Sequence, residues 1–260
     1  MTSVPPLSGR VAIVTGASGG IGRVVATTYA RHGAAVVVAA RRAGALAQTA
    51  QLITDAGGTA HSVVADLTDE TACTTVVRAA LDRFGRVDTL VNNAAAPGTD
   101  APVSEADSAN WHAVLATNLV APMTLSREVL RLAMLPARGG DIQFFSSAAA
   151  RRVLPNKAHY AASKRALSAL AETLALEVGP SGVRVNTVVI GAVSGDLVDG
   201  YVARTAASEG VDASVIRRRL SAGTALRRLV DPLEVAEVSA WLAGPAASAV
   251  TGQEIGVTGG

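Results

Sequence analysis

Short apolar runs alternate with amphipathic segments along the whole chain, and this alternation predicts its secondary structure. Runs rich in Val, Ala, Ile and Leu between turn residues are typical of strands that are buried on both faces of a sheet. Such runs predict strands at residues 10–15, 35–40, 61–65, 87–91, 141–145 and 183–189. Between the strands, apolar residues recur every three or four positions, which predicts helices.

The predicted helices carry start and stop signals. Gly33 ends the first helix, and Gly57 follows a helix predicted from Ala43 to Ala56. Asp69 is the expected cap of a helix that contains Cys73. A long helix is expected around 109–135, and a later one carries Tyr160. Alternation of strands and helices predicts a parallel sheet with right-handed crossovers and helices on both faces, a doubly wound α/β fold.

Composition supports one globular domain over residues 1–260, because 49% of the residues are hydrophobic and 17% are charged. A net charge of +2 without a long basic run does not favour nucleic acid. The single cysteine, Cys73, excludes an internal disulfide and a cysteine-built zinc site. The first eight residues do not read as a signal peptide, and no apolar run of ~18 residues predicts a membrane span. We therefore expect a cytoplasmic protein.

The first candidate for chemistry is Tyr160-x-x-x-Lys164. On a helix, residues four positions apart share one face, so the phenol and the ammonium should lie side by side. A neighbouring cation favours the phenolate, and we therefore expect Lys164 to lower the pKa of Tyr160 for acid–base work. Ser147 follows the predicted strand at 141–145 and its hydroxyl could reach the same reacting oxygen. Alone, however, this five-residue pattern is a common accident of helices.

A nucleotide site is predicted at the first strand–helix turn, Thr15-Gly-Ala-Ser-Gly-Gly-Ile-Gly22. Glycines allow a tight turn and close approach of a pyrophosphate, and the helix N-terminus offers unpaired N–H groups. The spacing of Gly16, Gly20 and Gly22 differs from G-x-G-x-x-G.

Together these motifs resemble the short-chain dehydrogenase/reductase family over nearly the whole chain. The glycine turn, Asn92-Asn-Ala94, Asn118, Ser147, Tyr160-x-x-x-Lys164, Arg184-Val-Asn186 and the segment 250–260 follow the family's order and spacing. The resemblance implies a Rossmann-type fold and an oxidoreductase that moves a hydride between a nicotinamide dinucleotide and a carbonyl/alcohol pair, without a metal. It points to enzymes similar to 3-oxoacyl-[acyl-carrier-protein] reductases.

The resemblance also implies a role for each matching residue. Tyr160 would be the proton donor, Ser147 would bind the substrate oxygen, and Lys164 would bind the nicotinamide ribose. Asn118 would hold a water that links Lys164 to solvent, and Asp66 would lie beside the adenine. The implied cofactor contacts are Gly16, Ser18, Gly20, Ile21, Gly22, Arg41, Arg42, Asp66, Leu67, Asn93, Ala94, Tyr160, Lys164, Gly191 and Val193.

The end of the second predicted strand indicates NADP(H), with NAD(H) as the alternative. Relatives that prefer NAD carry an acidic residue there for the ribose hydroxyls, whereas this chain has Ala40 followed by Arg41 and Arg42. A guanidinium forms paired, charge-assisted bonds with phosphate, so we expect Arg41 to clamp the 2′-phosphate and Arg42 to support it. The expected physiological direction is carbonyl reduction.

Several positions depart from the family pattern. Ala95 replaces a glycine, Ile190-Gly191 replaces Pro-Gly, and Val257-Thr258 replaces Val-Asp. Gly195 stands where a threonine would hold the nicotinamide carboxamide, so that contact could have moved to Ser194 or been lost. Of these departures, Ile190 and Gly195 bear on the placement of the nicotinamide and support a rival hypothesis, a dinucleotide-binding sensor without catalysis.

The substrate is the least determined property. A lid is expected at about 194–223, and Arg151, Arg152, Arg138 and the run Arg217–Arg219 could favour an anionic, carrier-bound or coenzyme A-bound acyl group. The leading hypothesis is a 3-oxoacyl thioester or similar ketone, and the alternative is a secondary-metabolite or steroid-like alcohol. His159 is expected to face away from the site. We also expect a homo-oligomer, a tetramer or a dimer, formed through the 109–135 and Tyr160 helices and the C-terminal segment 255–260.

Overall fold

The structure, a computed structural model, describes residues 5–260. The predicted N-terminal arm, residues 1–8, therefore lies partly outside the described residues. Its second half packs on the body, because Leu7 is buried and its N–H donates to the His32 carbonyl at 2.9 Å.

Seven parallel strands form one sheet in the order β3-β2-β1-β4-β5-β6-β7. Their bounds are β1 Val11–Thr15, β2 Ala35–Ala40, β3 Thr59–Val64, β4 Thr89–Asn92, β5 Gly140–Ser147, β6 Val183–Ile190 and β7 Glu254–Val257. The order runs outward from β1 in both directions, so the crossover direction reverses between β1 and β4. In doubly wound sheets, ligands bind at the carboxyl ends of the strands at this reversal. The predicted fold class is confirmed.

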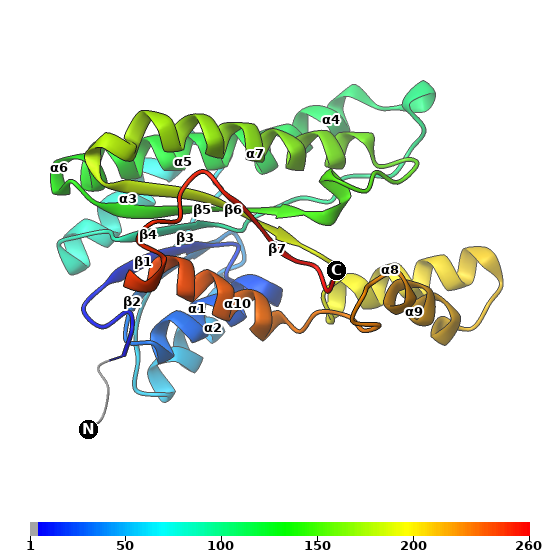
Figure 1. The fold of residues 1–260 in the computed structure, drawn as a ribbon, viewed down its shortest axis with the longest axis horizontal. Coiled ribbons are helices and arrows are strands. Elements are labelled where there is room, and N and C mark those ends of the chain that lie inside the picture. Colours follow the sequence, from blue (N-terminus) through cyan, green and yellow to red (C-terminus); the bar gives the residue numbers. More distant parts are fainter. Residues whose placement is uncertain (1–4) are drawn as a thin grey trace.

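Helices cover both faces of the sheet (Figure 1). One layer contains α1 Gly20–Arg31, α2 Ala43–Asp55 and α10 Pro232–Ala243, and the other contains α3 Glu70–Phe84, α4 Ser108–Leu115, α5 Ala121–Val129, α6 Leu135–Ala137 and α7 Ala158–Val178. Each layer has its own apolar core, because alternate residues of the central strands point to opposite faces. Val14, Val36 and Val38 belong to the core under α1, and Ile13, Val37 and Leu90 to the other.

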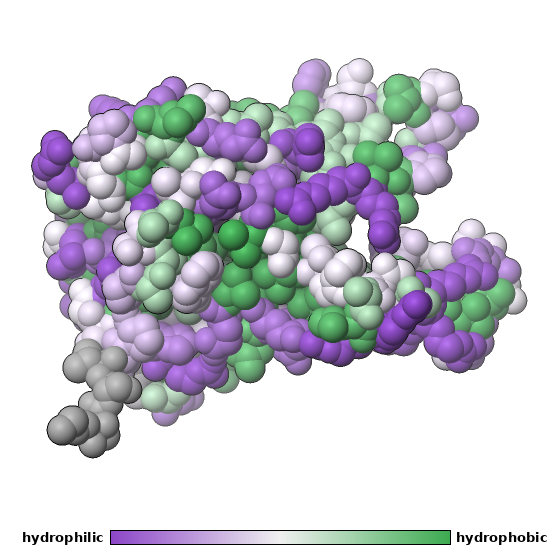
Figure 2. All heavy atoms as spheres, viewed as in Figure 1, coloured by the Kyte–Doolittle hydropathy of each residue, from purple (hydrophilic) through white to green (hydrophobic). Residues whose placement is uncertain are grey.

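Two further helices form a lobe outside these layers. α8 Asp196–Glu209 and α9 Ala213–Ala222 project from the carboxyl edge of the sheet beside the C-terminus (Figure 1). Val202, Ala206 and Ile216 give this lobe a small core of its own, separate from the two main cores. The lobe covers most of the segment expected as a lid, and the surface is hollowed between it and the body (Figure 2).

Most predicted elements agree with the structure, with differences at their ends. β2 has the predicted bounds and Asp69 caps α3, where its carboxylate accepts from the Thr71 N–H at 2.8 Å. The fourth strand begins at Thr89 and not at Val87, and the third begins at Thr59 and not at His61. The predicted 109–135 helix is helical over 108–137 but has two π-helical turns, at Ala116–Val120 and Leu130–Met134. Single extra residues in these turns shift the helix face, which a 3.6-residue pattern cannot show.

No helix within the described part of the chain combines the length and the apolar character that crossing a membrane requires.

Candidate active site

One cavity of about 620 Å³ lies at the carboxyl ends of the strands, where the crossover direction reverses. β1 and β4 supply its centre, β2 and β3 one end, and β5 and β6 the other. The structure brings together almost all predicted site residues along this cavity: Gly16, Ser18, Gly20, Ile21, Gly22, Arg41, Arg42, Asp66, Leu67, Asn93, Ala94, Ser147, Tyr160, Lys164, Gly191 and Val193. Of the predicted residues, Asn118 alone does not line it.

The glycine turn between β1 and α1 is held from behind by β4. The Thr15 hydroxyl accepts from the N–H groups of Asn93 and Ala94, both at 3.0 Å. A side-chain carbon at Gly22 would lie 2.4 Å from Asn93 Nδ2 and 2.5 Å from the Gly16 carbonyl oxygen. Gly16 and Gly22 are therefore required by contacts inside the protein, and not by approach of a ligand.

The opposite side of the turn is bare. At Gly20, with φ +51°, no atom lies within 4 Å of the position that a side-chain carbon would take. Gly20 is the first residue of α1, and no side chain caps this helix. Free backbone N–H groups and a positive helix end therefore face the cavity, which is the arrangement that binds a pyrophosphate.

Two guanidinium groups lie at the end of the cavity that follows β2. Arg42 Nη2 donates to the Ser18 hydroxyl at 3.1 Å, and Arg41 Nη1 lies 3.8 Å from an Asp66 carboxylate oxygen. The Asp66 pKa lies below its usual value, mainly because the Thr68 backbone N–H and hydroxyl bind the carboxylate. α2 begins immediately after Arg42, with no side-chain cap. This end of the cavity is therefore positive and has an uncapped helix start.

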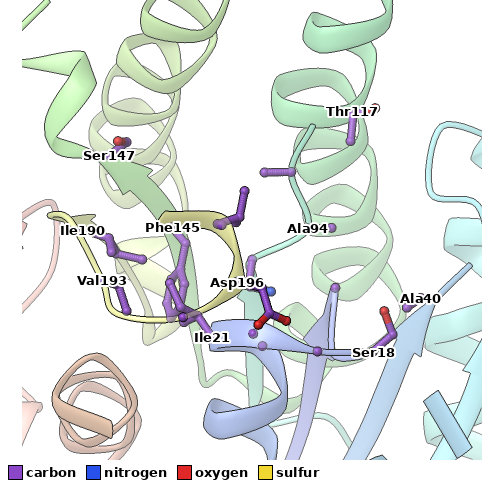
Figure 3. Close-up of a pocket in the computed structure, with 18 of the residues that line it drawn as sticks. Ser18, Ile21, Ala40, Ala94, Thr117, Phe145, Ser147, Ile190, Val193 and Asp196 are labelled. Carbon is purple, nitrogen blue, oxygen red and sulfur yellow. The ribbon is translucent and has the colours of Figure 1, made fainter. Parts of the chain in front are cut away.

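Three groups with acid–base or hydrogen-bonding capacity meet at the other end. Ser147 is the last residue of β5, and Tyr160 and Lys164 lie on one face of α7, with Ser147 at the edge of the cavity in Figure 3. The Ala149 N–H donates to the Ser147 hydroxyl oxygen at 3.2 Å. The Ser147 hydroxyl accepts this bond and keeps its own hydrogen to donate, either to the Tyr160 oxygen or to a bound carbonyl.

Lys164 is buried and its ammonium donates to the Phe145 carbonyl at 2.7 Å. Burial lowers the Lys164 pKa to about 8, since an apolar surrounding disfavours the charged form. Lys164 Nζ lies 5.9 Å from the centre of the Tyr160 ring.

The expected lowering of the Tyr160 pKa is wrong in this structure. Burial of the phenol raises the Tyr160 pKa, and the Ser147 side chain opposes that shift only in part. The ammonium of Lys164 is directed to the Phe145 carbonyl, so it does not compensate for the desolvation. Tyr160 is accordingly held in its protonated form at neutral pH, which suits a proton donor.

Asn118 lies in the π-helical turn and is fully buried. Its carbonyl oxygen accepts from the Ala96 N–H at 2.7 Å, and its amide donates to the Ala96 carbonyl at 2.9 Å and the Ser163 hydroxyl at 3.0 Å. The side chain therefore fixes the β4–α4 connection against α7. A role in a water relay stays a prediction.

The departures from the family pattern have structural counterparts. A side-chain carbon at Gly191 would lie 2.7 Å from Thr258 Cα, so glycine is required where β6 leaves the sheet. The Ser194 hydroxyl donates to the Val230 carbonyl at 3.3 Å, so its hydrogen is not aimed at the cavity. Gly195 has φ +131°, a conformation that strains a threonine.

The arginines that suggested an anionic substrate are engaged within the protein. Arg151 pairs with Glu254, and Arg152 donates to the Gly223 carbonyl at 3.2 Å. In the lobe, Arg217 pairs with Asp199 at 2.6 Å, Arg219 pairs with Glu209, and Arg218 donates to Ser214. Arg138 donates to the Pro180 carbonyl beside the amino-terminal end of β5. None of these side chains lines the cavity.

The sequence analysis missed some cavity residues, among them Thr117, Phe145 and Asp196 (Figure 3). Phe145 is predicted as a strand residue, but its side of the sheet depends on the register. Asp196 follows Gly195 as the first residue of α8, and no sequence signal gives the direction of its carboxylate. Among residues 5–260, no three His, Cys, Asp or Glu side chains gather as metal ligands would.

Comparison with known protein families decides the assignment. The sequence model of the short chain dehydrogenase family matches residues 10–225. The chain belongs to this family. It is similar to a putative ketoacyl reductase of Streptomyces coelicolor, with 34% identity over 252 residues, which is 96% of each chain.

Two solved structures of short-chain dehydrogenases share the fold over nearly their whole length. A crystal structure of an actinorhodin polyketide ketoreductase variant with NADPH has a TM-score of 0.92 and 33% identity, and covers 96% of both chains. The structure of a NAD+-bound xylitol dehydrogenase has a TM-score of 0.91 and 31% identity, and covers 98% of this chain and 99% of the other.

This short-chain dehydrogenase is therefore a dinucleotide-binding oxidoreductase that acts on carbonyl/alcohol pairs. The cavity fits such a cofactor, because a bare helix start, a positive end and a proton-donor group lie in one line along the strand ends. The two structures differ in their nicotinamide cofactor, so family membership leaves the choice between NAD and NADP open.

Proposed function

We propose that this enzyme is an NADP(H)-dependent ketoreductase of the 3-oxoacyl type. The observation that carries the proposal is the polarity of the cavity. Arg41 and Arg42 lie at the end over β2, and Ser147, Tyr160 and Lys164 lie at the end over β5 and α7. A dinucleotide laid across the glycine turn would place its adenosine ribose at the first end and its nicotinamide at the second.

Each residue at the nicotinamide end has a separate role in carbonyl reduction. The reduced nicotinamide supplies a hydride to the carbonyl carbon when the cofactor is bound. Tyr160 gives its proton to the carbonyl oxygen, and Ser147 donates a hydrogen bond to the same oxygen as negative charge grows on it. Lys164, held by the Phe145 carbonyl, keeps two N–H groups for the nicotinamide ribose. One C–H and one O–H bond form, and the carbonyl becomes an alcohol.

The preference for NADP(H) is supported by three features at the end of β2. Ala40 provides no carboxylate to accept from the ribose hydroxyls or to repel a phosphate. Arg41 and Arg42 provide two cations, and the uncapped start of α2 adds free N–H groups. Two cations at a helix start oppose its dipole, and a bound phosphate would relieve that opposition.

We expect Arg41→Ala to raise the KM for NADPH by about tenfold or more while changing the KM for NADH less than threefold, because only NADPH carries the 2′-phosphate. The difference should shrink at high salt, since the side chain is exposed. Arg42→Ala, measured in the same way, should raise the KM for NADPH less than Arg41→Ala does, because Arg42 is expected only to support the phosphate contact of Arg41. Wild-type enzyme with a higher kcat/KM for NADH than for NADPH would refute the NADP(H) proposal.

A ketone substrate with apolar surroundings is supported by the residues around the nicotinamide end. Ala95, Ile190 and Val193 line the cavity there. Leu197 on α8 also lines the cavity, and it is an apolar side chain at 76% exposure. Because the nearby arginines already bind groups within the protein and do not line the cavity, an acyl thioester would be recognised through its 3-oxoacyl part and not through its anionic carrier.

The function is tested with purified enzyme, NADPH and a panel that contains acetoacetyl-coenzyme A, an uncharged 3-oxo ester and cyclic ketones, including a steroid ketone. Oxidation of NADPH with the first two substrates supports the 3-oxoacyl assignment. Exclusive activity on the cyclic ketones would favour the secondary-metabolite or steroid-like alternative. Cofactor binding without turnover of any carbonyl would favour the non-catalytic sensor.

A homo-oligomer remains our proposal, with a tetramer preferred over a dimer. α5 and α7 lie together on one face of the molecule (Figure 1), and Met123 and Leu176 are exposed there, at 38% and 82%. β7 ends the sheet with an unpaired edge, and Trp241 on α10 is 43% exposed. Light scattering at micromolar concentration should report a multiple of the 26.2 kDa chain. A monomer under these conditions would contradict this proposal.

The lid role of residues 194–223 and a cytoplasmic location also stay predictions.

A further inference from the structure

Asp196 is an exposed residue whose carboxylate lines the cofactor cavity, and the proposed roles of the other site residues do not explain it. It is the first residue of α8, and its side chain points into the cavity in Figure 3. Within residues 5–260 it makes no hydrogen bond and no ion pair, whereas Asp199 of the same helix turn pairs with Arg217. The carboxylate is therefore free to interact with a bound molecule.

The backbone before Asp196 sets this direction. Gly195 has φ +131° and ψ −176°, and a side-chain carbon added there would meet no atom within 4 Å. A larger residue would therefore have room at position 195. Glycine is favoured there by the backbone conformation, which other residues adopt only with strain. The glycine allows the chain to turn sharply after Ser194, so that α8 starts with its first side chain over the cavity.

The topology places Asp196 at the nicotinamide end. It follows β6, and β6 lies beside β5, which ends in Ser147. Arg41, Arg42 and Asp66 lie beyond β1, on the other side of the crossover reversal. A single negative group at the nicotinamide end has a specific chemical consequence, because the oxidised nicotinamide ring is a cation and the reduced ring is neutral.

We infer that Asp196 contacts the nicotinamide and binds its oxidised form in preference to its reduced form. This inference rests on the proposed dinucleotide site and deepens it. The carboxylate stabilises the positive charge that appears on the ring as the hydride leaves, so it favours reduction of the carbonyl on the enzyme. It also takes over the polar contact at this position that Gly195 does not provide and that Ser194 directs to the Val230 carbonyl.

The inference is tested by equilibrium binding without substrate. Dissociation constants for NADP+ and NADPH are measured by fluorescence or calorimetric titration for the wild type and for Asp196→Asn, which keeps the shape and removes the charge. A carboxylate near the ring favours the cation by about tenfold, or about 1.4 kcal/mol. The ratio of the NADP+ to the NADPH dissociation constant should therefore rise about tenfold in Asp196→Asn, and less at high salt.

Asp199→Asn is the matched control, because Asp199 lies in the same turn of α8 but pairs with Arg217 and does not line the cavity. Its binding ratio should equal that of the wild type. An unchanged ratio in Asp196→Asn would overturn the inference. So would equal tightening of both forms, which would place the carboxylate beside the pyrophosphate. Failure of the wild type to bind either form would instead contradict the proposed dinucleotide site itself.

Discussion

Tyr160→Phe is expected to lower kcat for ketone reduction by about 10²- to 10⁴-fold, the range for loss of a positioned general acid. Of Ser147, Tyr160 and Lys164, the phenol is the group suited to give a proton to the carbonyl oxygen, because a serine hydroxyl is a much weaker acid and the Lys164 ammonium is directed to the Phe145 carbonyl. Burial raises its pKa, so the proton is in place throughout the neutral range. The ring that packs beside Lys164 is retained in the variant.

Cofactor binding separates loss of chemistry from loss of the site. The dissociation constant for NADPH should change less than threefold in Tyr160→Phe, since Arg41, Arg42 and the glycine turn are untouched. Tyr201→Phe is the matched control, because Tyr201 is also partly buried but belongs to the small core of the α8–α9 lobe. Its kcat should match that of the wild type. Turnover that survives in Tyr160→Phe would show that another group donates the proton.

Lys164→Met is expected to lower kcat/KM by about 10²-fold or more without destabilising the protein at pH 7. The variant loses the ribose contact and the charge beside Tyr160, but it keeps most of the side-chain volume. It also removes a buried ammonium, which is costly to desolvate. Lys164→Met therefore separates the loss of activity from a loss of stability more clearly than most active-site substitutions, which also remove favourable packing.

The pH dependence of stability gives a second readout. The Lys164 pKa is about 8 in the folded protein and 10.5 for an unperturbed lysine, so the unfolded chain binds this proton more tightly. The resulting penalty on the folded state, roughly 3 kcal/mol at most, is fully present below pH 8 and is relieved as the pH rises from 8 to 10.5. At pH 7, Lys164→Met should therefore unfold at the same temperature as the wild type or at a higher one.

The difference in Tm between Lys164→Met and the wild type should become smaller from pH 8 to pH 10, which differential scanning calorimetry can follow. Wild-type activity should also fall as the pH rises through about 8, because Lys164 then loses the charge that holds the ribose. If Lys164→Met were much less stable than the wild type at pH 7, burial of the charged Lys164 would not destabilise the folded state, which would contradict this prediction. Lys157→Met is a useful control, since Lys157 forms its pair with Asp100 at 2.6 Å.

Much of the fold could be predicted because its determinants are local. The run Ala35–Ala40 has the composition of a strand buried on both faces, and the structure gives it those bounds. Asp69 caps α3 through a bond two residues away, which depends on no distant contact. The first residues of β3 and β4 were predicted two positions away from where the structure has them. Pairing with the neighbouring strand, and not the strand's own residues, sets where each begins.

The candidate site was predictable to the extent that spacing defines it. Tyr160 and Lys164 share a helix face because they are four residues apart, and the glycine turn must lie at the carboxyl end of β1. Their pKa values were not predictable in the same way. The fall of the Lys164 pKa comes from burial, and the rise of the Tyr160 pKa comes mainly from burial, both under segments that are distant in the sequence.

By itself, the sequence determined a doubly wound α/β chain, its parallel strands and the residues that gather at their carboxyl ends. These follow from hydrophobic periodicity and from motifs whose members lie within a few positions of each other. Only the tertiary structure decided that Arg151, Arg217 and Arg219 are paired within the protein, because their partners lie between 10 and 103 positions away. It also decided that Asp196 faces the cofactor cavity, since that direction depends on a backbone turn at Gly195 and on where the α8–α9 lobe packs.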